Sequence, residues 1–213
     1  MRKMNILKYG LTTLMMSFAM TLCYSCSSDD DEETSQEVNP PSNGECEISG
    51  TIDGHDYVEL AGIKWATENV GAVDSLAPKF GTYGCYYTQP NAIKAAESWG
   101  EHWTLPTQGQ WRKLINNCRW ERGEKGFYVL DNDNRSKFIF LPAAGMFYSA
   151  SNLPGGDHGI GNHPSGQGLY GYYWAADNLP SFLKICFSFD DYTKRNLEPL
   201  FESFCMSVRP VVK

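Results

Sequence analysis

The chain lacks an excess of basic residues. Its 213 residues include 18 Lys and Arg against 25 Asp and Glu, which gives a formal net charge of -7 at pH 7. Proteins that bind nucleic acids normally present a basic face to the phosphates. This charge balance therefore argues against a nucleic-acid partner.

The chain also lacks the spacings that mark common catalytic and metal sites. The glycines of residues 149–171 do not follow a strand and open a helix, so no phosphate-binding loop is indicated. There are only four histidines, and no local nucleophile motif supports a Cys-His hydrolase. No C-x-x-C pair occurs after residue 45, so zinc and thioredoxin-like chemistry lack their usual signal. We therefore predict no catalytic residue, no metal site and no cofactor.

An odd number of cysteines follows residue 45. At least one of the five must stay unpaired, unless it pairs between two chains, and the sequence leaves their pairing open. They are Cys46, Cys85, Cys118, Cys186 and Cys205.

Long apolar runs are missing too. The N-terminal apolar stretch, residues 9–22, is shorter than the roughly 17–25 residues of a membrane-spanning helix. Basic residues precede it, as in a signal peptide. Cys26 follows it with Ser25 at the position before the cleavage, so residues 1–25 resemble a bacterial lipoprotein signal and Cys26 the lipidated cysteine. The alternative is an ordinary secretory signal with Cys26 as a plain thiol.

Residues 26–45 form an acidic segment without apolar periodicity. It is rich in Ser, Asn, Pro and acidic residues, which predicts a disordered tether. Its acidic run resembles the surface-export signal of Bacteroidota lipoproteins. We expect the protein at the cell outer membrane, surface-exposed, with membrane contact through the lipid anchor only.

Residues 46–213 are enough for one well-cored domain. The first half predicts a hairpin over Ile48–Leu60 with an Asp53-Gly54 turn and a strand over Gly62–Ala66. It also predicts a helix over Pro90–Trp99 and a second helix from a capping box at Thr107 and Gln110 to Cys118. The second half predicts five strands, around an irregular loop at 149–171: Phe127–Leu130, Lys137–Leu141, Tyr172–Ala175, Phe182–Phe189 and Ser203–Val211. Two helices with a largely antiparallel twisted sheet and long irregular loops indicate the α+β class.

Four phrases occur in a characteristic order. They are Lys64–Ala72 (KWATENVGA), Leu105–Thr107 leading to Trp111, Ile139–Gly145 (IFLPAAG) and Ser207–Val211 (SVRPV). Over about residues 60–213 the chain resembles the Fibrobacter succinogenes major paralogous domain family. Glu68 stands where that family commonly has Cys.

The resemblance implies a C-type-lectin-like fold, shared with formylglycine-generating enzyme and phage receptor-binding tips. Such a scaffold brings its termini into one sheet and varies its long loops, and loops on rigid scaffolds commonly carry binding. Residues 149–171 are then the main variable loop. An oxidase related to formylglycine-generating enzyme is the least favoured reading, because Cys186 and Cys205 lie on separate expected strands and outside a matching motif.

Aromatic residues make up 14% of the chain, and some flank the expected loops. Trp65, Trp111 and Trp174 belong to the expected core, and Arg209 to a central strand as a buried, paired charge. Exposed aromatic rings can stack on sugars, and polar loop residues can converge on a ligand. The candidate contact residues are Trp99, Trp103, Tyr148, Asp157, His158, His163, Tyr170 and Tyr172.

The function that we expect is non-enzymatic adhesion by a surface lipoprotein that binds a glycan or a surface protein. The alternative is a structural or assembly subunit of a cell-surface complex.

Two segments, residues 89–91 and 131–134, resemble calcium-binding motifs but are more typical of a helix entry and a hairpin turn. Calcium binding stays open.

Overall fold

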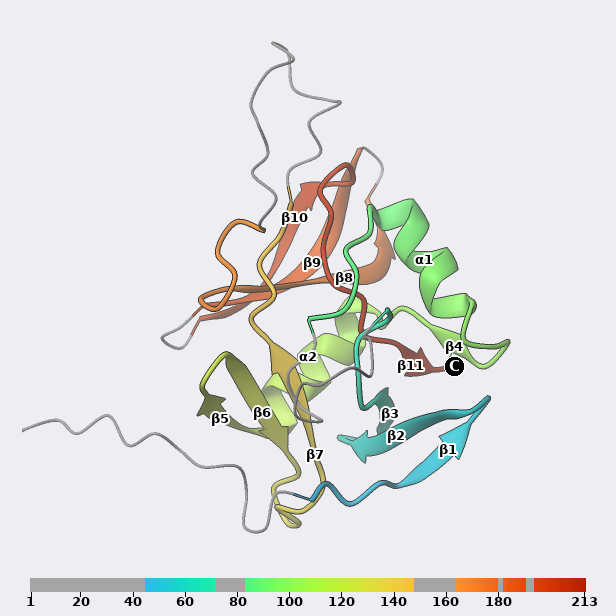
Figure 1. Ribbon diagram of the computed structural model, residues 1–213, viewed down its shortest axis with the longest axis vertical. Helices are drawn as coiled ribbons and strands as arrows, with labels where there is room; N and C mark the ends of the chain where they lie inside the picture. The colour runs from blue at the N-terminus through green and yellow to red at the C-terminus, as the bar shows by residue number, and fades with distance from the viewer. Residues whose placement is uncertain (1–44, 72–82, 148–163, 180–181, 191–193) are drawn as a thin grey trace, which may run out of the picture. The chain divides into compact units, whose positions relative to one another are not determined.

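The computed structural model describes residues 45–71, 83–147, 164–179, 182–190 and 194–213 (Figure 1). The expected signal peptide, Cys26 and nearly all of the tether lie outside these residues. Within them the chain forms two helices and three sheets in which every pair of named strands is antiparallel. This confirms the expected α+β class.

The first sheet joins both ends of the described chain. It opens with the predicted hairpin, whose turn residues Asp53 and Gly54 both have positive φ, 52° and 82°, as a type I′ turn requires. Val211 pairs with Trp65 on one side and with Thr104 on the other. The strand order is β1 (Gly50–Ile52), β2 (His55–Leu60), β3 (Ile63–Ala66), β11 (Val211–Val212) and β4 (Trp103–Thr104).

The other two sheets are three-stranded meanders (Figure 1). One consists of β5 (Arg119–Gly123), β6 (Gly126–Leu130) and β7 (Phe138–Pro142). The other consists of β8 (Gly171–Asn178), β9 (Leu183–Phe189) and β10 (Arg195–Phe201), with β9 in the middle. We call this last one the upper sheet, after its place in Figure 1.

The helices α1 (Gln89–Glu97) and α2 (Gln108–Asn117) pack on opposite faces of the upper sheet. Neighbouring residues of a strand point to opposite faces. Tyr173 lies in one core cluster with Trp111 of α2, whereas Trp174 lies in another with Ala92 and Ala96 of α1.

The predicted capping box of α2 is present. The Thr107 hydroxyl accepts from the Gln110 backbone N–H at 3.2 Å, and the Gln110 side chain accepts from the Thr107 N–H at 2.7 Å. Trp111 is buried as predicted and Leu114 is buried with it, while Ile115 and Cys118 are partly buried against the same core. Helix α1 ends at Glu97, so Trp99 lies beyond the helix, not within it as predicted.

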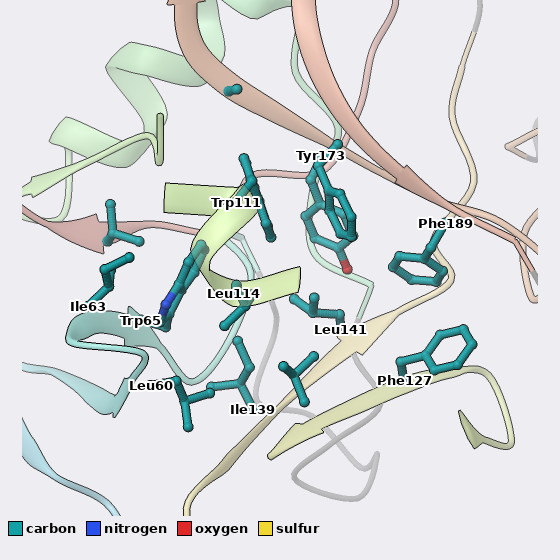
Figure 2. Packing of buried hydrophobic residues seen from close by; sticks show 14 of the residues in the cluster. Leu60, Ile63, Trp65, Trp111, Leu114, Phe127, Ile139, Leu141, Tyr173 and Phe189 are labelled. Carbon is teal, nitrogen blue, oxygen red and sulfur yellow. The ribbon is translucent and has the colours of Figure 1, made fainter. Parts of the chain in front are cut away.

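Aromatic rings fill the main core. Figure 2 shows the Trp111 ring between those of Trp65 and Tyr173, with ring centroids 4.8 Å and 5.8 Å away. Phe187 stacks on Trp111 at 4.5 Å. Such pairs contribute about 0.5–1.5 kcal/mol each beyond their buried area.

Three strands, β4, β5 and β10, were not predicted, and one predicted strand was wrong. Strand β5 was not predicted, because charged residues fill a strand at the edge of its sheet. Strand β10 was missed because it contains Pro199, which an edge strand tolerates. Residues 203–211 form isolated bridges at 205–207 and then β11 instead of one strand, since Pro210 cannot donate to a ladder.

Candidate functional site

Three of the four phrases meet at one buried guanidinium group. Arg209 donates from Nε to the side chain of Asn69 at 2.8 Å. Its other nitrogens donate to the backbone carbonyls of Ala66 at 2.9 Å and Phe140 at 2.7 Å. Burial lowers the pKa of Arg209 to about 10, against the opposing effects of Tyr173 and Glu68. Arg209 is thus buried as predicted, but it precedes β11 instead of lying within a strand.

The fourth phrase holds α2 against the upper sheet. The Ala176 N–H donates to the Pro106 carbonyl at 2.9 Å. The Gln108 N–H at the start of α2 donates to the Asp177 carboxylate. All four phrases therefore serve packing and hydrogen bonding inside the domain, and a binding site has to be sought on other residues.

The two candidate tryptophans belong to a cluster at the end of α1. Trp103 is fully buried, and its Nε1 donates to the Ile52 carbonyl at 3.2 Å. The prediction of Trp103 as a contact residue is therefore wrong in this structure. Trp99 is half-buried, and its ring stacks on His55 with centroids 3.8 Å apart. This cluster attaches the β1–β2 hairpin to the segment after α1.

Four other candidates lie outside the described residues. They are Tyr148, Asp157, His158 and His163. Tyr170 and Tyr172, at the C-terminal end of the expected variable loop, are described. Of the eight candidates, Tyr170 and Tyr172 are thus the two that the structure places side by side with both rings at least partly exposed.

Tyr170 and Tyr172 form an aromatic pair at the start of β8. Their ring centroids are 6.4 Å apart, and 42% of Tyr170 is exposed while Tyr172 is half-buried. The Tyr170 ring lies against Gly166, where any side chain would collide with it. A φ of +72° at Gly166 also favours glycine there.

A row of polar side chains continues from Tyr172 across the upper sheet. Tyr172 is paired with Ser188 of β9, and Ser188 with Asn196 of β10. Paired residues share a face, with Cβ atoms about 4.5–5.5 Å apart. The Ser188 hydroxyl and Glu198 Oε1 are 2.5 Å apart. We call these five residues the tyrosine site: Tyr170, Tyr172, Ser188, Asn196 and Glu198.

The row lies on the α1 face of the upper sheet. Trp174 and Cys186, the next paired positions on that face, pack against α1. Ser188 is buried, Glu198 is half-buried and Asn196 is exposed. Sequence analysis missed all three. The polar position of Ser188 between Phe187 and Phe189 was a visible signal, but β10 was not predicted, so its partners could not be found.

A second exposed group contains only phenylalanines. Phe182 and Phe201 are 61% and 48% exposed, and their rings stack in parallel at 5.5 Å. Phe204 meets Phe201 edge-on at 5.8 Å. We call these three residues the phenylalanine patch, which sequence analysis did not identify. Beside it, Lys184 and Glu202 form an ion pair at 3.7 Å.

All five cysteines of the described residues are free thiols. Cys186 is fully buried and Cys205 half-buried, and the two are not joined by a disulfide. Burial raises the pKa of Cys118 to about 12 and also raises the pKa values of Cys46, Cys186 and Cys205. A raised pKa disfavours the reactive thiolate form of these four side chains.

The described part of the chain contains no group of three His, Cys, Asp or Glu side chains that could hold a metal ion. None of its helices is long and apolar enough to cross a membrane. A scan against protein-family models and searches of curated proteins and of solved structures each found no match to this chain.

Proposed function

We propose that this protein is a non-enzymatic binding module of the cell surface, anchored through a lipid on Cys26, and that its tyrosine site binds a glycan. One observation carries the proposal. Two partly exposed tyrosine rings lie beside a row of hydrogen-bonding side chains on one face of a sheet.

This combination suits the two chemistries of a sugar ring. The apolar C–H face of a sugar can stack on tyrosine, while hydroxyl groups of the sugar bond to polar side chains. Ser188, Asn196 and Glu198 together supply a hydroxyl, an amide and a carboxylate. Their positions on paired strands fix their spacing, which reduces the entropy lost on binding.

The fold supports the proposal at a coarser level. Terminal strands that share a sheet, and two helices around an antiparallel sheet, agree with what the resemblance implies. We therefore propose the C-type-lectin-like fold for residues 46–213. The site that we propose keeps Tyr170 and Tyr172 of the expected candidates and adds Ser188, Asn196 and Glu198 from β9 and β10.

A glycan array probed with the full-length protein tests this function. We expect the Tyr170→Ala/Tyr172→Ala variant to lose binding, because it removes the stacking faces. The matched control is Phe182→Ala/Phe201→Ala, which removes two exposed rings outside the site and should bind normally. Absence of binding to every glycan contradicts the proposal, as does binding that survives in the tyrosine variant. Circular dichroism checks that each variant is folded.

The phenylalanine patch favours the second candidate function, a structural or assembly subunit that docks a protein partner. Its exposed faces are apolar, whereas a glycan site needs polar groups that converge beside the ring. Chemical cross-linking on intact cells separates the two functions. For an assembly subunit, Phe182→Ala/Phe201→Ala abolishes the cross-linked complex while the tyrosine variant retains it.

A further inference from the structure

The carboxylate of Glu198 has a fixed place in the tyrosine site. Its Oε1 lies 2.5 Å from the Ser188 hydroxyl, which can only donate to an ionised carboxylate. Strand pairing places Glu198 opposite Cys186, next to the row that Tyr172 begins. The half-buried carboxylate is thus held within the site.

The charges around the row leave it negative. Among the described residues no salt bridge involves Glu198. Beside the row, two residues after Ser188 and two before Asn196, the backbone N–H of Lys194 donates to the Asp190 carboxylate at 3.0 Å. Lys194 and Asp190 contribute one positive and one negative charge, and Lys184 and Glu202 form an ion pair at 3.7 Å, so neither pair adds a net charge. Glu198 therefore gives the tyrosine site its net negative charge.

A fixed carboxylate discriminates among glycans by charge. Sugar hydroxyls and ammonium groups donate hydrogen bonds to it, and bonds to a charged acceptor are stronger than neutral ones. A uronic acid or sulfated sugar instead brings a second anion close to Glu198, and like charges repel most where water is partly excluded. From this geometry we infer that the tyrosine site takes neutral or amine-bearing glycans and excludes acidic ones through Glu198. The inference rests on the proposed glycan-binding function.

The test compares three classes of oligosaccharide with the full-length protein: neutral glucans and galactans, amine-bearing chitosan oligomers, and carboxylated polygalacturonate oligomers. We expect the affinity for the acidic class to be lower than for the best neutral or amine-bearing ligand by about tenfold or more. The Glu198→Gln variant keeps the side-chain shape and an oxygen for Ser188. It should lower the discrimination against acidic ligands by a similar factor of about ten.

The matched control is Glu59→Gln, which neutralises an exposed carboxylate on β2, in another sheet, and should leave the discrimination unchanged. Preferred binding of acidic glycans by the wild type overturns the inference while the glycan-binding function stands. Equal discrimination in wild type and Glu198→Gln overturns it as well. If no class of glycan binds, the proposed function itself fails.

Discussion

At the scale of single residues, the burial of Arg209 could be predicted from the sequence but its hydrogen-bond partners could not. Its burial was predicted because SVRPV was expected to form a central strand, although Arg209 in fact precedes β11. Its partners were not, since they come from Asn69, Ala66 and Phe140, more than 60 positions away. Only the folded topology brings those oxygens together.

Replacement of Arg209 by methionine should strongly destabilise the domain. Methionine matches the apolar stem of arginine but can no longer donate to three buried oxygens, and each unsatisfied buried acceptor costs about 1–3 kcal/mol. We expect the free energy of unfolding, measured by urea denaturation, to fall by about 3 kcal/mol or more.

The control for this prediction is Arg135→Met. Arg135 forms a two-pronged pair with Glu121, at 2.6 Å and 2.8 Å, but its side chain is 45% exposed. Exposed pairs contribute about 1 kcal/mol or less. Equal losses in the two variants would show that the Arg209 network adds nothing to stability beyond that of a surface pair.

At the scale of elements, features that depend on neighbouring residues were predicted correctly, whereas a strand that depends on pairing with another strand was missed. The β1–β2 turn and the α2 cap depend on residues within four positions of one another, and both are present. Strand β10 depends instead on its pairing with β9, which compensates for its proline and its exposed positions. The tyrosine site could not be predicted in full for the same reason, because Asn196 and Glu198 lie on β10.

The capping box of α2 gives a prediction with an internal control. Thr107→Ala removes the hydroxyl that accepts from Gln110, and loss of an N-cap costs about 1 kcal/mol. The N-cap of α1, Thr88, makes no side-chain capping hydrogen bond. We therefore expect Thr88→Ala to change the unfolding free energy by no more than about 0.5 kcal/mol. Urea denaturation of both variants measures the difference, and a larger loss for Thr88→Ala would contradict the assignment.

At the scale of the whole molecule, the predicted lipid anchor is followed by a strongly acidic segment. Seven of the 25 acidic residues lie between Cys26 and Cys46, where the tether is predicted. The remaining residues carry the folded sheets and the proposed binding site. A lipid on Cys26, at the start of this acidic segment, would hold that site near the cell surface.

Substitution of Cys26 by alanine tests this division. Each buried methylene of an acyl chain contributes about 0.8 kcal/mol to membrane affinity, and stable anchoring needs more than one chain. We expect Cys26→Ala to lose incorporation of labelled palmitate and to leave the membrane fraction. Cys23→Ala, three positions earlier, should keep both properties because its thiol is not the predicted acceptor. Since Cys26 is not one of the five residues of the tyrosine site, the released protein should still bind glycan on the array. Membrane association that persists in Cys26→Ala would mean that the protein is held by something other than the predicted lipid.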